Sequence, residues 1–179
     1  MTSQMLTLLV SGILINRRRN NMSKSTFERV AEWNYRCNKE PLLVGTEEYW
    51  DALELQLLRI QEELKETMKA VHDRDLVELL DGGCDLDVTV SGLNYLSGLE
   101  YQKAINRVLS NNDVKYTTEI AYAIEASNKY TADGEDCEVQ SVQDNGEIYF
   151  SVHRTSDNKI MKLLNHPKVS LVDLAVEVS

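Results

Sequence analysis

The chain of 179 residues carries 29 acidic and 19 basic side chains, which give a formal net charge of -10. This length suits a single domain, because one core of that size buries about two thirds of the unfolded surface. Nucleic-acid backbones and anionic membranes attract basic surfaces, so we expect the chain to bind neither. An anionic small substrate would need a metal ion as an intermediary. Three cysteines without metal-ligand spacing indicate reduced thiols and a soluble, cytoplasmic protein.

Residues 1–21 differ from the rest of the chain. An apolar run from Met5 to Ile15 precedes three arginines at positions 17 to 19, the reverse of the order in a secretory signal. The run is also shorter than the roughly 20 residues of a transmembrane helix. We expect a dispensable extension, so that a chain beginning at Met22 keeps its activity. The alternatives are an arm for packing or oligomerisation and a weak membrane contact.

Three helices are predicted in the first half of the chain. The first begins near Ser25 and ends before Pro41. The second runs from Thr46, a suitable N-cap followed by two glutamates, to about Val71. The third covers about residues 74–97.

The second helix carries apolar residues at helical spacing, which predict a core face. They are Leu53, Leu57, Ile60, Leu64, Met68 and Val71. Leu55 and Leu58 lie on the opposite side, so we expect this helix to be covered on both faces. Two covered faces in a small chain suggest a homodimer or a homotetramer.

The third helix combines an apolar face with an acidic line. The apolar face is formed by Leu76, Leu79, Leu86, Val90 and Leu93. Glu78, Asp81 and Asp85 follow one another at i, i+3 and i+7 on another face, and Thr89 and Gly92 extend their line. Gly82 and Gly83 each cost about 1 kcal/mol relative to alanine in a helix, so they predict a close approach by a backbone or a ligand.

The second half is predicted to complete a helical bundle and to end in a small β-hairpin. Two further helices are expected over about 100–110 and 117–129. Extended segments at 138–142 and 148–152 flank the turn Asp144-Asn145-Gly146. A short strand near 159–162 and a loose or helical tail after Pro167 follow. The predicted fold is therefore mainly α, with a helical core over 22–132 and an appendage over 133–179.

Two acidic motifs carry the predicted chemistry. Glu62-Glu63-x-x-Glu66 lies on the second helix, and Glu78-x-x-Asp81 with Asp85 lies on the third. Residues three or four apart share a helix face, so each helix offers carboxylates to the gap between them. Several carboxylates in one gap repel one another unless a cation neutralises them, and oxygen ligands suit Mg²⁺ or Mn²⁺. The first motif taken alone is more typical of a solvated helix face, and the acidic line of the third helix is the stronger indication of a metal site.

The two motifs together resemble the signature of the MazG-like superfamily of all-α nucleotide pyrophosphohydrolases, over roughly residues 26–163. The superfamily includes phosphoribosyl-ATP pyrophosphohydrolase and helical dUTP and dCTP pyrophosphatases. The run from Asp75 to Asp85 resembles a phage and bacterial subgroup. Two later elements of that subgroup, S-N-x-x-K and G-K-x-x-K, are similar to Ser127-Asn128-Lys129, with the lysine displaced, and to the segment 158–162, with asparagine for glycine.

The resemblance implies a helical bundle that assembles as a homo-oligomer and hydrolyses a nucleoside triphosphate to monophosphate and pyrophosphate. It implies metal coordination by Glu63, Glu66, Asp85 and either Glu78 or Asp81. Glu62 is the next candidate ligand, and Glu62 or Glu63 would act as the base. A specialised dCTP, dUTP or phosphoribosyl-ATP hydrolase is the alternative within this class. The alternative outside it is a catalytically inactive module that senses nucleotides or binds a protein.

Residues outside the acidic motifs complete the predicted site. Lys129, Lys159 and Lys162 are candidates to contact the triphosphate, where cations stabilise charge on the leaving pyrophosphate. Trp33 and Asn34 are candidates to line a base pocket. The alternatives are solvated surface lysines and an aromatic residue that belongs to the core.

Overall fold

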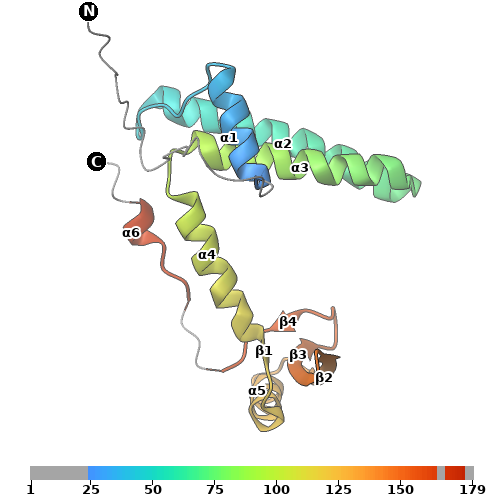
Figure 1. Cartoon of the computed structure of the whole chain (residues 1–179). Coiled ribbons are helices and arrows are strands. Elements are labelled where there is room, and N and C mark those ends of the chain that lie inside the picture. The colour runs from blue at the N-terminus through green and yellow to red at the C-terminus, as the bar shows by residue number, and fades with distance from the viewer. Residues whose placement is uncertain (1–23, 165–167, 176–179) are drawn as a thin grey trace, which may run out of the picture. The chain divides into compact units, whose positions relative to one another are not determined.

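The computed structural model describes residues 24–164 and 168–175 and divides the chain into two compact units (Figure 1). One unit contains the described residues up to Tyr101 together with Leu174 and Ala175, and the second spans Gln102–Asp173. The division falls about 30 residues before the expected boundary at 132. The predicted extension, residues 1–21, lies outside the described residues.

The first predicted helix is confirmed as α1 (Thr26–Arg36). Its start is fixed by a capping box, in which the Glu28 amide donates to Ser25 Oγ at 3.3 Å and the Ser25 amide donates to Glu28 Oε2 at 2.9 Å. The Glu28 carboxylate accepts from the Ser25 amide and also from Ser25 Oγ, and these two hydrogen bonds lower the pKa of the Glu28 carboxyl. The side chains of Ser25 and Glu28 therefore determine where α1 begins.

The second and third predicted helices form an antiparallel hairpin of α2 (Glu47–Asp73) and α3 (Leu76–Leu96). Thr46 caps α2 by accepting the Tyr49 amide at 3.2 Å. Asp75 caps α3 by accepting the amides of Val77 and Glu78 at 3.0 and 3.1 Å. The chain reverses between the helices through Arg74, which adopts the left-handed conformation at φ 57°. Short connections of this kind hold neighbouring helices antiparallel.

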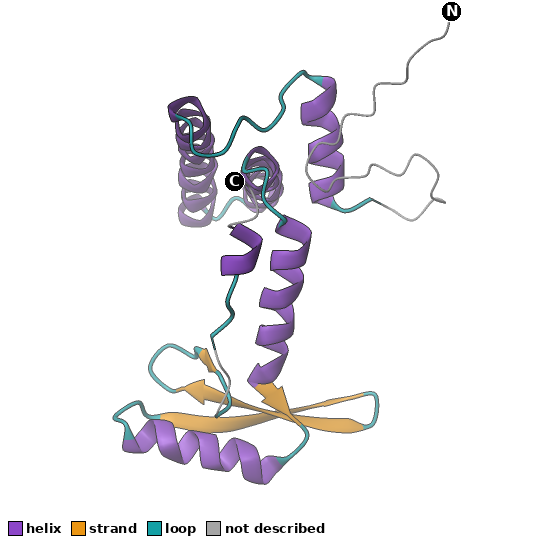
Figure 2. Ribbon diagram, turned by 90° about the vertical axis from the view of Figure 1, so that its left-hand side faces the viewer, coloured by secondary structure: helices purple, strands orange, loops and turns teal. Residues whose placement is uncertain are grey.

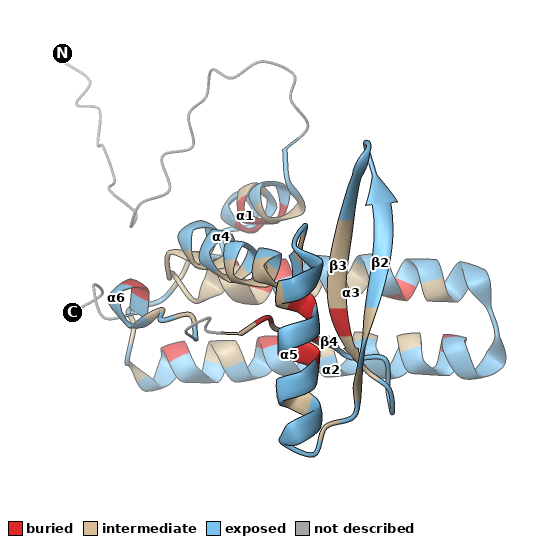
Figure 3. Cartoon of the chain, turned by 90° about the horizontal axis from the view of Figure 1, so that it is seen from below, coloured by how far each residue is buried: buried red, intermediate tan, exposed pale blue. Residues whose placement is uncertain are grey.

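The face of α2 that is buried overlaps the predicted core face only in part. Gln56 is buried and its Nε2 donates to the Thr89 carbonyl at 2.9 Å, and Ala70 is also buried. Within the predicted core stripe Leu53 and Ile60 are half-buried, whereas the others are exposed: Leu57 52%, Leu64 45%, Met68 63% and Val71 58%. Leu55 and Leu58 are exposed as well, so the described residues of the single chain leave both faces of α2 partly uncovered (Figure 3).

The apolar face predicted for α3 is confirmed only in part. Leu79, Leu86 and Leu93 are half-buried, but Leu76 and Val90 are exposed. As in α2, some apolar residues of the predicted face are exposed, because the close contacts between the two helices are made by small residues such as Gly82 and Gly92.

One of the two mid-helix glycines of α3 serves a close approach between backbones. A Cβ added to Gly82 would lie 2.4 Å from Thr67 Oγ1 and 3.2 Å from Thr67 Cα, too near for any side chain. A Cβ added to Gly83 would meet nothing within 4 Å. Gly82 therefore confirms the sequence prediction and Gly83 does not. Gly92 plays a similar part, with Gln56 Nε2 2.9 Å from where its Cβ would stand.

The second unit combines helices with an antiparallel sheet (Figure 2). Its elements in chain order are α4 (Tyr101–Asn112), a 3-10 turn (Asp113–Lys115), β1 (Tyr116–Thr117), α5 (Ile120–Ala132), β2 (Cys137–Asp144), β3 (Glu147–Arg154) and β4 (Ile160–Met161). A last short helix, α6 (Val172–Ala175), follows. The fourth and fifth helices, the hairpin and the final strand are thus all present, and β1 adds a strand that the sequence analysis missed.

The predicted β-hairpin is confirmed with its turn. β2 pairs with β3 along its whole length, from Cys137 opposite Arg154 to Asp144 opposite Glu147. Asn145 and Gly146 take positive φ values of 49° and 88°, as the two-residue turn that matches strand twist requires. β1 and β4 both pair with β3, so β3 is the central strand.

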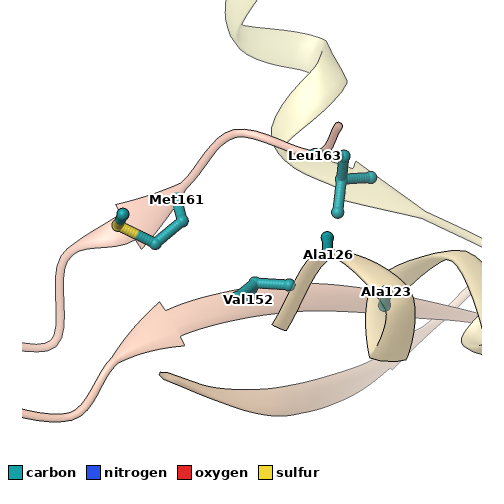
Figure 4. Packing of buried hydrophobic residues seen from close by; sticks show 5 residues of the cluster. All are labelled: Ala123, Ala126, Val152, Met161 and Leu163. Atoms are coloured by element: carbon teal, nitrogen blue, oxygen red, sulfur yellow. The ribbon is translucent and has the colours of Figure 1, made fainter. Parts of the chain in front are cut away.

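The core of the second unit lies between α5 and the sheet (Figure 4). It consists of Ala123, Ala126, Val152, Met161 and Leu163. The small alanines at i and i+3 let α5 approach β3 closely, and Val152 is 0% exposed. α5 therefore covers the apolar face of the sheet in its own unit, and the expected bundle of five helices is not confirmed.

No helix in the described parts of the chain combines the length and the apolar character needed to cross a membrane.

Candidate metal site on the helical hairpin

The acidic residues of α2 stand beside the line of contact with α3. Glu63 and Thr67 are half-buried on the side of α2 that faces α3. Glu62 and Glu66 each come one residue earlier and are exposed. A step of one residue turns about 100° around a helix, so both glutamates project from the same flank of α2.

The acidic residues of α3 show the same relation to its contact line. Gly82 packs against Thr67 of α2, and Leu86 is half-buried. Asp81 and Asp85 each come one residue before these two positions. Glu78 in turn precedes the half-buried Leu79. In antiparallel helices, residues that precede the facing positions lie on the same flank of the hairpin.

The hairpin therefore has one acidic edge, to which both helices contribute. The acidic edge is defined as Glu62, Glu63, Glu66, Glu78, Asp81 and Asp85. All six residues belong to the first unit, so their arrangement follows from the hairpin alone. The sequence analysis predicted carboxylates from the two helices in one gap, and the structure brings their backbones together on one side.

The pKa of Glu63 reflects the mutual repulsion of these carboxylates. Partial burial, followed by the negative charges of Asp85, Glu66, Glu62 and Asp81, raises the pKa of the Glu63 carboxyl. Carboxylates from both helices thus act on one another across the gap. A cation placed among them would relieve this repulsion.

Asp81 and Glu78 have different surroundings. The charge of Asp81 contributes to the raised pKa of Glu63, whereas the charge of Glu78 contributes to the raised pKa of Lys69, after that of Asp73. Lys69 forms an ion pair with Asp73 near the end of α2. Glu78 therefore lies toward the connection between the helices, and Asp81 is the closer partner of Glu63.

The donor chemistry of the acidic edge suits a hard divalent cation. Carboxylate oxygens on two rigid helices are the ligands that Mg²⁺ and Mn²⁺ take in proteins. Within residues 24–164 and 168–175, no three His, Cys, Asp or Glu side chains converge closely enough to hold an ion between them. The carboxylates of the edge would have to turn toward one another when a cation binds.

The predicted lysines all belong to the second unit, whereas the residues of the acidic edge belong to the first. Lys129 is exposed on α5, and Lys159 is exposed in the turn between β3 and β4, where its amide donates to Asp157 Oδ1 at 3.2 Å. Lys162 is half-buried and its Nζ donates to Asn111 Oδ1 of α4. Lys159, before β4, and Lys162, after it, therefore differ, because the Lys159 side chain is exposed and Lys162 has a polar partner.

A shallow hollow of about 490 Å³ lies beside Asn111 in the second unit. It is lined by Asn106, Arg107, Ser110, Asn111, Val114, Val169 and Ser170. Arg107 is the cation of this lining, and it is engaged by Asp173 through two hydrogen bonds of 2.6 Å. The Asp173 carboxylate thus already neutralises the charge that would attract a phosphate.

The predicted base-pocket residues of α1 have opposite environments. Trp33 is half-exposed and offers a free aromatic face. Asn34 is buried, and its Nδ2 donates to the Val30 carbonyl at 2.9 Å inside the helix. The amide group of Asn34 is thus committed to α1, while Trp33 is open to a ligand.

Gln56 is a buried polar residue near the site that the sequence analysis did not select. It donates to the Thr89 carbonyl and its Oε1 accepts from Arg59 at 2.9 Å, which links the two helices. Gln56 lies seven residues before Glu63 and therefore on the same face of α2. A polar residue between apolar ones on this helix is the feature of the sequence that could have identified it.

Comparisons of this chain with protein-family models, with curated proteins and with solved structures gave no match.

Proposed function

We propose that the acidic edge binds Mg²⁺ and that the protein hydrolyses a nucleoside or deoxynucleoside triphosphate to the monophosphate and pyrophosphate. The observation that carries the proposal is the pairing of E-E-x-x-E on α2 with E-x-x-D and Asp85 on α3 along one edge of a hairpin. The resemblance of these motifs to MazG-like enzymes supplies the reaction. Mn²⁺ has the same ligand preference and is the alternative metal.

Glu63, Glu66, Asp81 and Asp85 are the proposed ligands. Asp81 is preferred to Glu78, because Asp81 adjoins Gly82, which packs against Thr67 next to Glu66, whereas Glu78 lies about one turn nearer the connection between the helices. A bound Mg²⁺ would neutralise phosphate charge and polarise the phosphorus that is attacked. The chain's own part is to hold the carboxylates on two rigid helices, with Gly82 setting the spacing between them.

The proposed reaction breaks the bond between the α-phosphorus and the oxygen that bridges to the β-phosphate. A water oxygen forms the new bond to the α-phosphorus, and pyrophosphate departs with the bridging oxygen. Glu62 or Glu63 accepts the proton from the water. Lys129, Lys159 and Lys162 are proposed to contact the triphosphate, and Trp33 is proposed to stack on the base.

The experiment that tests the proposal is incubation of the full chain with a panel of ribo- and deoxynucleoside triphosphates and Mg²⁺, followed by identification of the products. Monophosphate and pyrophosphate are expected. Diphosphate and phosphate as the only products would refute cleavage between the α- and β-phosphates. Binding of a nucleotide without turnover would favour the inactive nucleotide-sensing module instead.

Substitutions on the acidic edge assign the activity to these residues. Glu66→Gln and Asp85→Asn are each expected to abolish turnover while the fold survives, since both remove repulsion rather than packing. Asp87→Asn is the matched control for Asp85→Asn, because Asp87 is exposed and only two residues away on α3. Full activity in the edge variants, or equal loss in the control, would remove the edge from the site.

A further inference from the structure

Three polar side chains of the second unit form a hydrogen-bonded series that the proposed hydrolysis of triphosphates does not use. Ser151 Oγ lies 2.9 Å from His153 Nε2, and His153 Nδ1 lies 2.9 Å from Asn158 Oδ1. The serine triad is defined as these three residues. All of them belong to β3 or to the turn that follows it, so their arrangement is set within one unit.

The sheet places Ser151 and His153 on the face opposite α5. Successive side chains of a strand point to opposite faces, and Val152 between them lies in the core beside α5 (Figure 4). Ser151 and His153 are half-buried, whereas Val152 is fully covered. The hydroxyl and the imidazole therefore share a face of β3 that a small molecule can reach.

The turn between β3 and β4 holds Asn158 beside His153. The Asn158 backbone amide donates to the Arg154 carbonyl at 2.9 Å, and the Arg154 backbone amide donates to the Lys159 carbonyl at 2.9 Å. Asn158 adopts the left-handed conformation at φ 57°, which asparagine accepts more readily than most residues. The backbone of the turn therefore fixes the position from which the Asn158 side chain meets the histidine.

Neighbouring side chains determine the direction of each hydrogen bond. An ionised carboxylate only accepts, so Gln140 presents its Nε2 to Glu138, at 2.9 Å. The same Nε2 lies 3.5 Å from Asn158 Oδ1, which orients the Asn158 amide with its oxygen toward the series. In a neutral imidazole, His153 Nδ1 then donates to that oxygen, and Nε2 is the unprotonated nitrogen. The Ser151 hydroxyl therefore donates to His153 Nε2.

This directed series has the form of an activated nucleophile. A serine hydroxyl becomes nucleophilic when a histidine accepts its proton and a third group orients that histidine. We propose that Ser151 attacks aryl esters of carboxylic acids, with His153 as its general base and Asn158 as the positioning residue that orients the imidazole. The activity is separate from the proposed triphosphate hydrolysis, because no residue of the acidic edge takes part in it.

Two tyrosines beside Ser151 indicate the class of ester. Tyr149 precedes Ser151 by two residues on β3, and Tyr116 lies opposite Ser151 on β1, so both share its face of the sheet. Their rings pack edge to face with centroids 5.6 Å apart, and Tyr116 is 48% exposed. Aromatic rings pack favourably on one another, so an aryl group fits next to the Ser151 hydroxyl.

The proposed reaction has two steps. Ser151 Oγ forms a bond to the acyl carbon, the bond from that carbon to the aryl oxygen breaks, and the serine proton passes through His153 Nε2 to the departing oxygen. In the second step a water oxygen bonds to the acyl carbon, and one water proton passes through His153 Nε2 to the leaving Ser151 Oγ. The sum is ester and water giving carboxylic acid and phenol, with the serine regenerated.

The test uses the full chain with p-nitrophenyl acetate and, separately, with an alkyl fluorophosphonate, which transfers its phosphonyl group to activated serines as fluoride leaves. Release of p-nitrophenolate is expected, together with a label on Ser151 in peptide mass spectrometry. Ser151→Ala and His153→Ala are each expected to lower the protein-dependent rate of ester hydrolysis by at least about 100-fold. Ser141→Ala and His72→Ala are the matched controls, because both residues are exposed and lie outside the triad.

Variants of Asn158 separate positioning from folding. Glycine adopts a positive φ without strain, so Asn158→Gly removes the oxygen acceptor and leaves the turn intact, which thermal unfolding will verify. We expect kcat for the ester to fall by at least about 10-fold with little change in KM. Asn158→Asp restores an oxygen acceptor for His153 Nδ1 and is expected to recover the rate.

Three results would each overturn the proposal. They are absence of both ester hydrolysis and labelling, a label that falls on residues other than Ser151, and ester hydrolysis that survives Ser151→Ala. Survival in Ser151→Ala with loss in His153→Ala would make the histidine the direct nucleophile. Triphosphate hydrolysis is expected to be unchanged in Ser151→Ala, so a negative result with the ester leaves the proposed function of the acidic edge to its own test.

Discussion

The hairpin and the second unit differ in how they bury their apolar side chains. α5 lays its alanines on β3, and Val152, Met161 and Leu163 close a core that the unit buries by itself. The hairpin pairs two long helices in part through small or polar residues, and although it buries Tyr49 and Tyr95, several of its leucines are exposed. A layer of helix on sheet encloses one core, whereas two helices alone enclose only the line between them.

Apolar residues at helical spacing identify a helix face that can be covered, but their spacing does not identify the element that covers it. In α5 the partner is the sheet of the same unit. In α2 the residues that meet α3 are Gln56, Thr67 and Ala70, and the leucine stripe is left for another surface. Four experiments test this contrast.

The largest effect is expected from the lysines of the second unit, and it tests whether that unit serves the chemistry of the hairpin. Lys159→Ala with Lys162→Ala is expected to lower kcat/KM by roughly 10- to 1,000-fold, because cations near the leaving pyrophosphate stabilise developing charge. Steady-state kinetics with the best nucleotide measure this effect. Lys168→Ala is the control, since Lys168 is an exposed lysine of the same unit. Activity within about twofold of wild type in the double variant would confine the site to the hairpin.

The self-contained core is tested by Val152→Ala. Val152 is 0% exposed, and losing its two methyl groups is expected to cost about 2 kcal/mol of the free energy of unfolding at any chain concentration. Leu64→Ala on the exposed side of α2 is expected to cost less, under about 1 kcal/mol, because Leu64 is 45% exposed. Urea unfolding of both variants measures the difference. Equal losses at Val152 and Leu64 would mean that Leu64 is buried as fully as the core residue.

The two glycines of α3 test the packing inside the hairpin. Gly82→Ala is expected to destabilise the protein by about 1 to 2 kcal/mol, because its Cβ would collide with Thr67. Gly83→Ala is expected to stabilise it by up to about 1 kcal/mol, since the helix gains propensity and no atom is in the way. Thermal unfolding of both variants measures the difference. Equal shifts for the two glycines would show that the helices are not in close contact there.

The smallest effect concerns the exposed ion pair at the turn between β3 and β4. Hydrogen bonds of 2.9 and 2.8 Å from Arg154 lower the pKa of Asp157 from 3.8 to about 2. A lowered pKa means that the pair stabilises the folded unit above pH 3.8 and that this contribution is lost as the pH falls toward about 2. Asp157→Asn is expected to remove this part of the acid dependence, measured by circular dichroism during acid titration. An identical acid transition in the variant would show that the exposed pair contributes nothing.

The sequence by itself determined the elements whose signals are local. The Ser25 and Glu28 capping box, the Thr46 cap and the Asn145-Gly146 turn each act within four residues, so their identities are enough to fix helix starts and a hairpin. The acidic edge was predictable for the same reason, because helical spacing alone puts Glu62 with Glu66 and Asp81 with Asp85 on one flank.

Tertiary structure decided which face of each helix is buried and where the chain divides. Gly82 against Thr67 and Gln56 against Thr89 are contacts between residues 15 and 33 positions apart, and they turn α2 so that its leucines face outward. The packing of Ala123 and Ala126 of α5 with Val152 of β3 joins residues 26 or more positions apart and makes that helix the cover of a sheet. Periodicity cannot choose between such partners, because a helix presents its apolar stripe in the same way to a neighbouring helix, to a sheet or to a second chain.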